Sequence, residues 1–294
     1  MSKLSENTIK DRIKNLAKVT GLKTTDIYKK LFLERFLARL SVSSYADKFV
    51  FKGGNLLSYY LPIFRETFDL DFITTELFTA KSVIAQIFTE IGQIKLDDGF
   101  VIDLIDIAPL CHPAMLHAGF RVTMTIKFKE GHLKDNIQID VAVGDQMVSP
   151  TKVFSLIAYN DHPLFEEYVS LRAYPPERIF AEKLEAAFSK VSDNSRMKDY
   201  NDLILMCRHK TLLNHQQLCN FILLTFKERQ TKLILPIKPK TDGRPIIEQY
   251  WQAFRLKLMK FSGQDYLPPK FSQVLHELNE FLIKLNLPLD KINQ

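Results

Sequence analysis

Two aspartates stand two residues apart in the segment Asp69-Leu70-Asp71, where apolar and polar residues alternate. This alternation predicts a half-buried strand over residues 68–73, on which the two carboxylates project from the same face. Carboxylates held so close repel each other, and a divalent cation removes that repulsion. Mg²⁺ takes one or two carboxylates together with phosphate oxygens and water, so the pair predicts half of a site for Mg²⁺ or Mn²⁺. For this motif alone, the alternative is a solvated strand face that carries two acids.

A glycine pair, Gly53-Gly54, follows the short apolar run Phe49-Val50-Phe51 and precedes a helix predicted over residues 56–61. Glycine allows a tight turn and close approach of a ligand to the backbone. Free N–H groups and the positive dipole end at a helix start favour a phosphate. A lone glycine pair is an ordinary turn. The succession of glycine turn, helix and Asp-x-Asp strand instead predicts a phosphate site beside a metal site, within about 20 residues.

A third carboxylate, Asp140, lies within the apolar run from Ile137 to Val143. Ionised carboxylates are rarely buried without a partner, and a metal ion would supply one. We therefore expect Asp140 to complete a two-metal site with Asp69 and Asp71. Asp145, just beyond this run, is a weaker candidate for the third acid.

The elements that position these residues follow from hydrophobic periodicity. Apolar residues at three- and four-residue steps predict N-terminal helices, and a further helix is expected over residues 79–91. Strands are expected at residues 49–51, 68–73, 100–107, 120–128 and 137–143, and helices dominate beyond about residue 155. We therefore predict an α+β, or mixed α/β, fold. A mixed sheet with flanking helices fills residues 1–155, and a mostly helical domain fills residues 156–294.

Composition sets broad limits on the class of protein. The chain has 294 residues and is 46% hydrophobic, enough for one large or two medium domains. Its net charge of +6 permits a nucleic-acid partner without requiring one. The scattered cysteines Cys111, Cys207 and Cys219 argue against a disulfide framework or a zinc site. The chain shows neither an apolar leader nor a run of about 18 apolar residues, so we expect a cytoplasmic protein without a membrane partner.

The ordered motifs resemble a known family. The segments Phe51-Lys52-Gly53-Gly54-Asn55-Leu56 and Arg65-Glu66-Thr67-Phe68-Asp69-Leu70-Asp71-Phe72 look like the signature of the AbiEii/AbiGii toxins, in the DNA-polymerase-β-like nucleotidyltransferase superfamily. Downstream, Ile139-Asp140-Val141 resembles the third-acid strand, residues 176–184 the lysine-bearing helix, and residues 196–203 the Arg-x-(Arg/Lys)-Asp-x-x-Asp-Leu element. The resemblance spans about residues 48–206. Asn55 departs from it, because Thr or Ser is usual at that place in the turn.

The resemblance implies a nucleotidyltransferase-fold sheet and a role for each matching residue. Metal ions would be held by Asp69, Asp71 and Asp140. The nucleotide would be held by Lys52, Gly53, Gly54, Asn55, Arg65 and Lys183, with Arg65 pairing either with a phosphate or with the acids that follow it. From the helical domain, Lys183, Asp199 and Asp202 would join the catalytic set. One of these two aspartates would orient Lys183 or a substrate hydroxyl.

The same resemblance implies a function. The chain would transfer a nucleoside monophosphate from a nucleoside triphosphate to a hydroxyl at the 3′ end of tRNA, and would release pyrophosphate and inhibit translation. A cognate antitoxin would be its partner in a type IV toxin–antitoxin or phage-defence pair. Two alternatives stay open: nucleotidylation of a protein or small molecule on the same fold, and a non-catalytic nucleotide-binding module.

Overall fold

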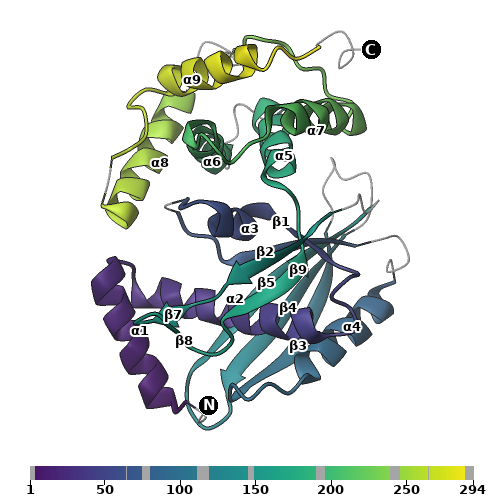
Figure 1. Ribbon diagram of the computed structural model, residues 1–294, viewed down its shortest axis with the longest axis vertical. Helices are drawn as coiled ribbons and strands as arrows, with labels where there is room; N and C mark the ends of the chain where they lie inside the picture. Colours follow the sequence, from purple (N-terminus) through teal and green to yellow (C-terminus); the bar gives the residue numbers. More distant parts are fainter. Residues whose placement is uncertain are drawn as a thin grey trace. The chain divides into compact units, whose positions relative to one another are not determined.

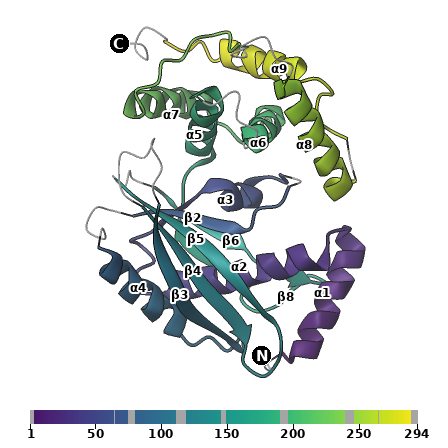
Figure 2. The same ribbon diagram turned by 180° about the vertical axis from the view of Figure 1, so that it is seen from behind.

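The computed structural model describes residues 4–63, 65–74, 80–110, 119–144, 149–189, 196–238, 246–263 and 265–288. The chain divides into two compact units. Unit 1 comprises Met1–Tyr59 and Glu66–Tyr174, and unit 2 comprises Tyr60–Arg65 and Pro175–Gln294. Figures 1 and 2 show the same ribbon from opposite sides. The boundary predicted at residue 155 lies within unit 1, which continues to Tyr174.

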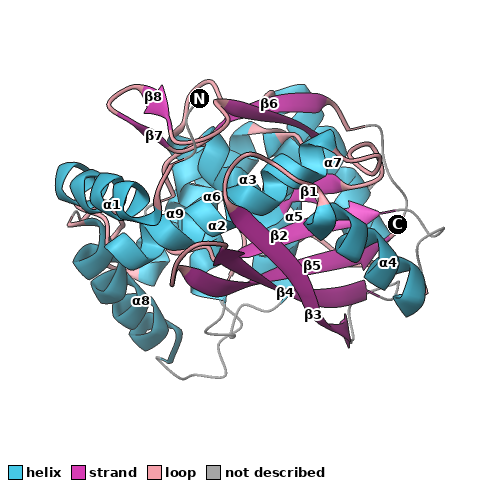
Figure 3. Ribbon diagram, turned by 90° about the horizontal axis from the view of Figure 1, so that it is seen from below, coloured by secondary structure: helices cyan, strands magenta, loops and turns pink. Residues whose placement is uncertain are grey.

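Unit 1 is built on a mixed five-stranded sheet with the order β1-β2-β5-β4-β3. Strand β2 runs parallel to β5, and all other neighbours are antiparallel. Figure 3 shows β2, β5, β4 and β3 side by side. The strands are β1 (Val50–Lys52), β2 (Asp69–Thr74), β3 (Phe100–Leu110), β4 (Gly119–Phe128) and β5 (Lys134–Val143). The mixed α/β fold class expected from the sequence is confirmed.

Helices bury one face of this sheet. The helices of unit 1 are α1 (Glu6–Thr20), α2 (Thr24–Val42), α3 (Gly53–Tyr60, whose last residue belongs to unit 2) and α4 (Lys81–Gln93). Phe88 on α4 stacks on Phe36 of α2, with ring centroids 5.7 Å apart, and it also meets Phe49, which in turn contacts Phe72 on β2. Each such ring contributes about 1.5–3 kcal/mol when fully buried. The helical face of the sheet is therefore its apolar face.

The burial of β2 follows the alternation predicted from its sequence. Leu70 and Phe72 are buried, while Asp69 and Asp71 are only partly covered. A slip of one residue would turn every side chain of the strand to the other face, so packing of the apolar face fixes the strand's register. That register holds both aspartates on the face opposite to the one that Leu70 and Phe72 occupy.

A buried ion pair joins α2 to the start of β3. Arg39 donates to both carboxylate oxygens of Asp98, at 2.8 and 3.0 Å, and to the backbone oxygen of Phe100 at 2.8 Å. Both charged side chains are 1% exposed. Because removing one partner would leave an uncompensated buried charge, this contact fixes where the helix lies on the sheet.

Residues 151–172 differ from the helical pattern expected beyond residue 155. They form the short strands β6 (Thr151–Ser155), β7 (Ala158–Tyr159), β8 (His162–Pro163) and β9 (Tyr168–Arg172). Strand β6 pairs with β9 and β7 with β8, both antiparallel. The backbone N–H of Tyr174 then donates to the oxygen of Phe51 at 3.0 Å. Strands of two to five residues are too short to give a clear periodic signal, so the sequence did not predict them.

Unit 2 is helical, as expected for the C-terminal half. Its helices are α5 (Pro176–Ser189), α6 (Met197–Arg208), α7 (His215–Glu228), α8 (Ile246–Ser262) and α9 (Phe271–Lys284). Proline suits the first turn of a helix, which accounts for the start of α5 at Pro176. The fully buried Trp251 anchors α8 and donates from its Nε1 to the oxygen of Pro268 at 2.9 Å. Within the described residues, no helix is both long and apolar enough to cross a membrane.

Candidate active site

The glycine turn and the Asp-x-Asp strand are in direct contact. Gly53 has a φ of +77°, and a Cβ atom added to it would lie 2.0 Å from Oδ2 and 2.7 Å from Cβ of Asp71. Helix α3 begins at this glycine. Glycine is required here twice, for the left-handed backbone and for the missing side chain. The first residue of α3 consequently lies directly against the Asp71 carboxylate.

The strand register lines up four charged residues across the sheet. Lys52 on β1 lies opposite Asp71 on β2, Asp71 lies beside Asp140 on β5, and Asp140 lies opposite Arg121 on β4. Residues paired in this way project from the same face of a sheet. We call this set, Lys52-Asp71-Asp140-Arg121, the charged row. Asp69 lies two residues before Asp71 on β2, beside Gln138 of β5, and so projects from the same face. The structure therefore brings together all three acids that the sequence singled out.

Arg121 is a site residue that the sequence analysis missed. Its guanidinium donates from Nε and Nη2 to both oxygens of Asp140, at 2.8 and 2.7 Å. The hydrogen bond to Asp140 is the largest cause of a raised Arg121 pKa, to which the charges of Asp69 and Asp71 also contribute. Arg121 occupies a polar position in the alternating pattern of β4. Only the pairing of β4 with β5 shows that this position lies opposite Asp140.

The donor set fits a divalent ion at Asp69 and Asp71. Two carboxylates on one strand face, completed by phosphate oxygens and water, make an ordinary Mg²⁺ site. Both oxygens of Asp140 already accept hydrogen bonds from Arg121. Across the described residues, no three His, Cys, Asp or Glu side chains form a group able to hold a metal ion as they stand. Asp145, the weaker candidate, lies outside the described residues.

Lys52 and Asn55 flank the glycine turn, where the sequence predicted nucleotide contacts. The Lys52 ammonium lies 5.2 Å from the centroid of the Tyr174 ring, a cation–π distance. Asn55 is buried, and its backbone oxygen accepts a hydrogen bond from Ser58 Oγ at 2.6 Å. The Asn55 side chain is thus covered within the first turns of α3.

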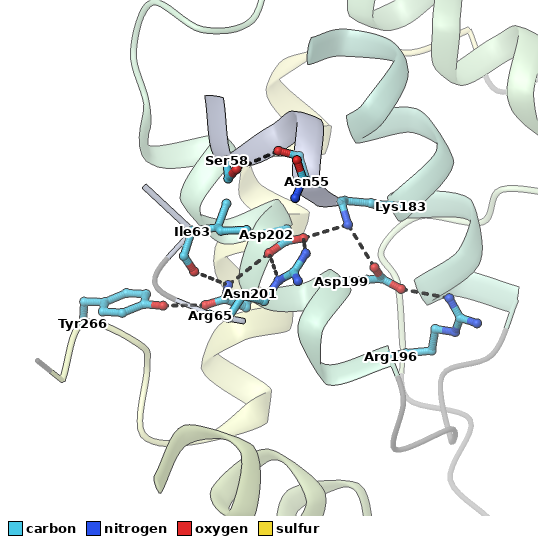
Figure 4. A network of polar contacts seen from close by, with 10 residues as sticks. All are labelled: Asn55, Ser58, Ile63, Arg65, Lys183, Arg196, Asp199, Asn201, Asp202 and Tyr266. Atoms are coloured by element: carbon cyan, nitrogen blue, oxygen red, sulfur yellow. Dashed lines mark hydrogen bonds and ion pairs between the residues drawn. The ribbon is translucent and has the colours of Figure 1, made fainter. Parts of the chain in front are cut away.

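The remaining predicted residues form a network of polar contacts in unit 2 (Figure 4). Arg65 donates to both oxygens of Asp202, at 2.8 and 2.6 Å. The ammonium of Lys183 lies 2.7 Å from Asp202 Oδ2 and 3.2 Å from Asp199 Oδ1. Arg196 donates to the other Asp199 oxygen at 3.0 Å. Within unit 2, the described partner of Arg65 is thus Asp202, and the predicted contact with a phosphate or with the acids that follow Arg65 stays a prediction.

In this network, Arg65-Lys183-Asp199-Asp202, the shifted pKa values of Lys183 and Asp202 favour their charged forms although both side chains are buried. Burial alone would raise the pKa of Asp202, but Lys183 and Arg65 outweigh it and lower the pKa from 3.8 to about 2. Burial would likewise lower the pKa of Lys183, yet Asp202 and Asp199 raise it. Asn201 Nδ2 adds a further hydrogen bond to Asp202 Oδ1 at 3.1 Å. Asp202 thus holds two cations with oxygens that are fully engaged.

Comparison with known proteins gives the family. The profile described as "Nucleotidyl transferase AbiEii toxin, Type IV TA system" matches residues 35–277, most of the chain. The chain belongs to the AbiEii family of nucleotidyltransferase toxins. A nucleoside triphosphate substrate and an antitoxin partner follow from that family, whose members generally use a divalent metal ion. The AbiEii resemblance predicted from the sequence motifs is confirmed.

Two solved structures from Helicobacter pylori are similar to this AbiEii chain. One is a candidate nucleotidyltransferase with 16% sequence identity and a TM-score of 0.46, covering 93% of this chain and 100% of its own. The other, JHP933, has 17% identity and a TM-score of 0.46, covering 90% of this chain and 94% of its own. No curated protein matches the chain.

Proposed function

We propose that this AbiEii-family toxin transfers a nucleoside monophosphate from a nucleoside triphosphate to the 3′-terminal hydroxyl of tRNA, and that it does so with a divalent metal ion. The contact between Gly53 and Asp71 carries the proposal. It brings a helix start, which is suited to a phosphate, next to a carboxylate that is suited to a metal ion, and nucleotidyl transfer requires both. The match of the family profile supports the reaction class.

In the reaction, the acceptor hydroxyl oxygen attacks the α-phosphorus. A new O–P bond forms, the bond from the α-phosphorus to the bridging oxygen breaks, and pyrophosphate leaves. A divalent ion, Mg²⁺ or Mn²⁺, held by Asp69 and Asp71 would steady the charge on the phosphate oxygens. Backbone N–H groups of Gly53 and Gly54, together with Lys52, would hold the phosphates, and Asp140 would face the acceptor hydroxyl.

We assign the unit 2 network a supporting role in the same reaction. Lys183 is the residue that would contact the triphosphate. Asp202 and Asp199 would act on it indirectly, because their oxygens are engaged in holding Lys183 and Arg65 in place. Arg65 is then a positioning residue for Asp202, and Asn55, which is buried in the first turn of α3, would support the glycine turn rather than bind phosphate.

The identity of the acceptor, tRNA, is more specific than the reaction class and has its own support. It is supported by the excess of 40 lysines and arginines over 34 aspartates and glutamates, which favours a polyanionic partner. Transfer to the acceptor end would stop translation in the cytoplasm, and a cognate antitoxin would restrain it. That pairing suits a role in phage defence.

The experiment is to incubate the protein with each α-³²P-labelled nucleoside triphosphate, Mg²⁺ and either total tRNA or total cell protein. Labelled tRNA from the wild type, and none from Asp71→Asn, is the expected result. Periodate-oxidised tRNA, which lacks the terminal hydroxyl, should stay unlabelled. Label in protein alone would replace tRNA by a protein acceptor, and no label in any fraction would overturn the transferase assignment.

A further inference from the structure

The charged row carries cations as well as acids. Reading across the sheet, it runs cation, acid, acid, cation, from Lys52 through Asp71 and Asp140 to Arg121. With Asp69 included, this face of the sheet carries three carboxylates and two cationic side chains. A single divalent ion brings such a group to a formal charge of plus one. Three carboxylates alone would need two divalent ions to reach the same charge.

The Asp140 carboxylate already has a cationic partner, the guanidinium of Arg121. Arg121 approaches through Nε and Nη2, so that the flat guanidinium meets both carboxylate oxygens in the bidentate geometry of strong Arg–carboxylate pairs. The arginine side chain is 44% exposed and that of Asp140 is 18% exposed, so the pair faces partly into solvent. Because Asp71 lies beside Asp140 in the strand register, Arg121 also lies near a second acid of the charged row.

We propose that the Arg121 guanidinium takes the place of a second divalent ion at Asp140, so that the site binds one divalent ion, through Asp69 and Asp71. The inference rests on the proposed nucleotidyl transfer and specifies its metal requirement. Arg121 is then a positioning residue. It fixes the Asp140 carboxylate, whose remaining lone pairs accept a hydrogen bond from the acceptor hydroxyl.

The test counts Mn²⁺ ions bound to the full-length protein, without nucleotide, from the electron paramagnetic resonance signal of free Mn²⁺. The wild type should bind one ion. Asp71→Asn should weaken that binding at least about tenfold, whereas Asp140→Asn should leave it within about twofold. Arg121→Gln should release Asp140 and either add a second Mn²⁺ ion or tighten binding at least about tenfold.

A matched control comes from the same strand. Lys127 lies on the same face of β4 as Arg121 and pairs with Asp103 at 3.4 Å, away from the acids of the charged row. Lys127→Gln removes the same charge and should leave the Mn²⁺ count and affinity unchanged. In the double variant Arg121→Gln/Asp140→Asn, the gain shown by Arg121→Gln should disappear. Circular dichroism of each variant checks that the fold is intact.

Three outcomes would overturn the inference: two Mn²⁺ ions bound by the wild type, an equal loss from Asp140→Asn and Asp71→Asn, or no gain from Arg121→Gln. The tRNA-labelling assay on the same preparations separates this inference from the proposed function. Two bound ions with active transfer would refute only the role of Arg121. One bound ion without transfer to any acceptor would refute only the proposed function.

Discussion

Gly53→Ala offers the sharpest test of the link between the turn and the acid. The added methyl would lie 2.0 Å from Oδ2 and 2.7 Å from Cβ of Asp71. Rotating the aspartate about χ1 moves its oxygens but not its Cβ atom, so a rotamer change cannot relieve the second contact. Carbon atoms pack at about 3.5–4.0 Å, so α3 and β2 must separate by about 1 Å.

That displacement predicts a large loss of activity. A shift of about 1 Å at a reacting group is enough to lower a rate about 100-fold. We therefore expect Gly53→Ala to reduce kcat for tRNA labelling about 100-fold or more. The left-handed backbone adds a cost of about 1–2 kcal/mol in the free energy of unfolding, measured by urea denaturation.

Gly21→Ala is the matched control. Gly21 has a φ of +72° at the end of α1, and an added Cβ atom would meet nothing within 4 Å. The Gly21→Ala variant should lose about the same 1–2 kcal/mol of unfolding free energy through backbone strain, and it should keep full transfer activity. If Gly53→Ala labels tRNA within about threefold of Gly21→Ala, the close approach of the turn to Asp71 is not needed for catalysis, and the reasoning fails.

The remaining predictions concern the acids and the unit 2 network. Asp71→Asn, or chelation of divalent ions with EDTA, should lower nucleotide transfer at least about 100-fold in the labelling assay. Lys183→Met should lower the free energy of unfolding in urea by about 3 kcal/mol, because it leaves buried carboxylates short of a cation. Since Lys183 and Arg65 lower the pKa of Asp202 from 3.8 to about 2, against the effect of burial, the ionised carboxylate stabilises the fold above about pH 3.8. The stability difference between wild type and Asp202→Asn should therefore shrink as the pH falls through about 2, and a difference independent of pH would contradict this explanation.

The local features of the site were predictable from the sequence. Alternation in β2 placed Asp69 and Asp71 on one face, because side-chain direction on a strand depends only on position within it. The glycine pair, the helix after it and the order of the motifs were enough to indicate the AbiEii family, which the family profile confirms. Each of these features lies within a short stretch of chain, where spacing alone carries the physical constraint.

The partners of these residues were decided by the tertiary structure. Arg121 meets Asp140 only because β4 pairs with β5, and β5 stands beside Asp71 only because it pairs in parallel with β2. The contact of Arg65 with Asp202 in the helical unit likewise depends on packing, because 137 positions separate the two residues in the chain. Such contacts join residues far apart in the chain. The sequence therefore determined which side chains share a face of a strand. The pairing of strands and the packing of helices determined which charges meet. Strand register is set by the burial of the whole apolar face, which no short stretch of sequence specifies.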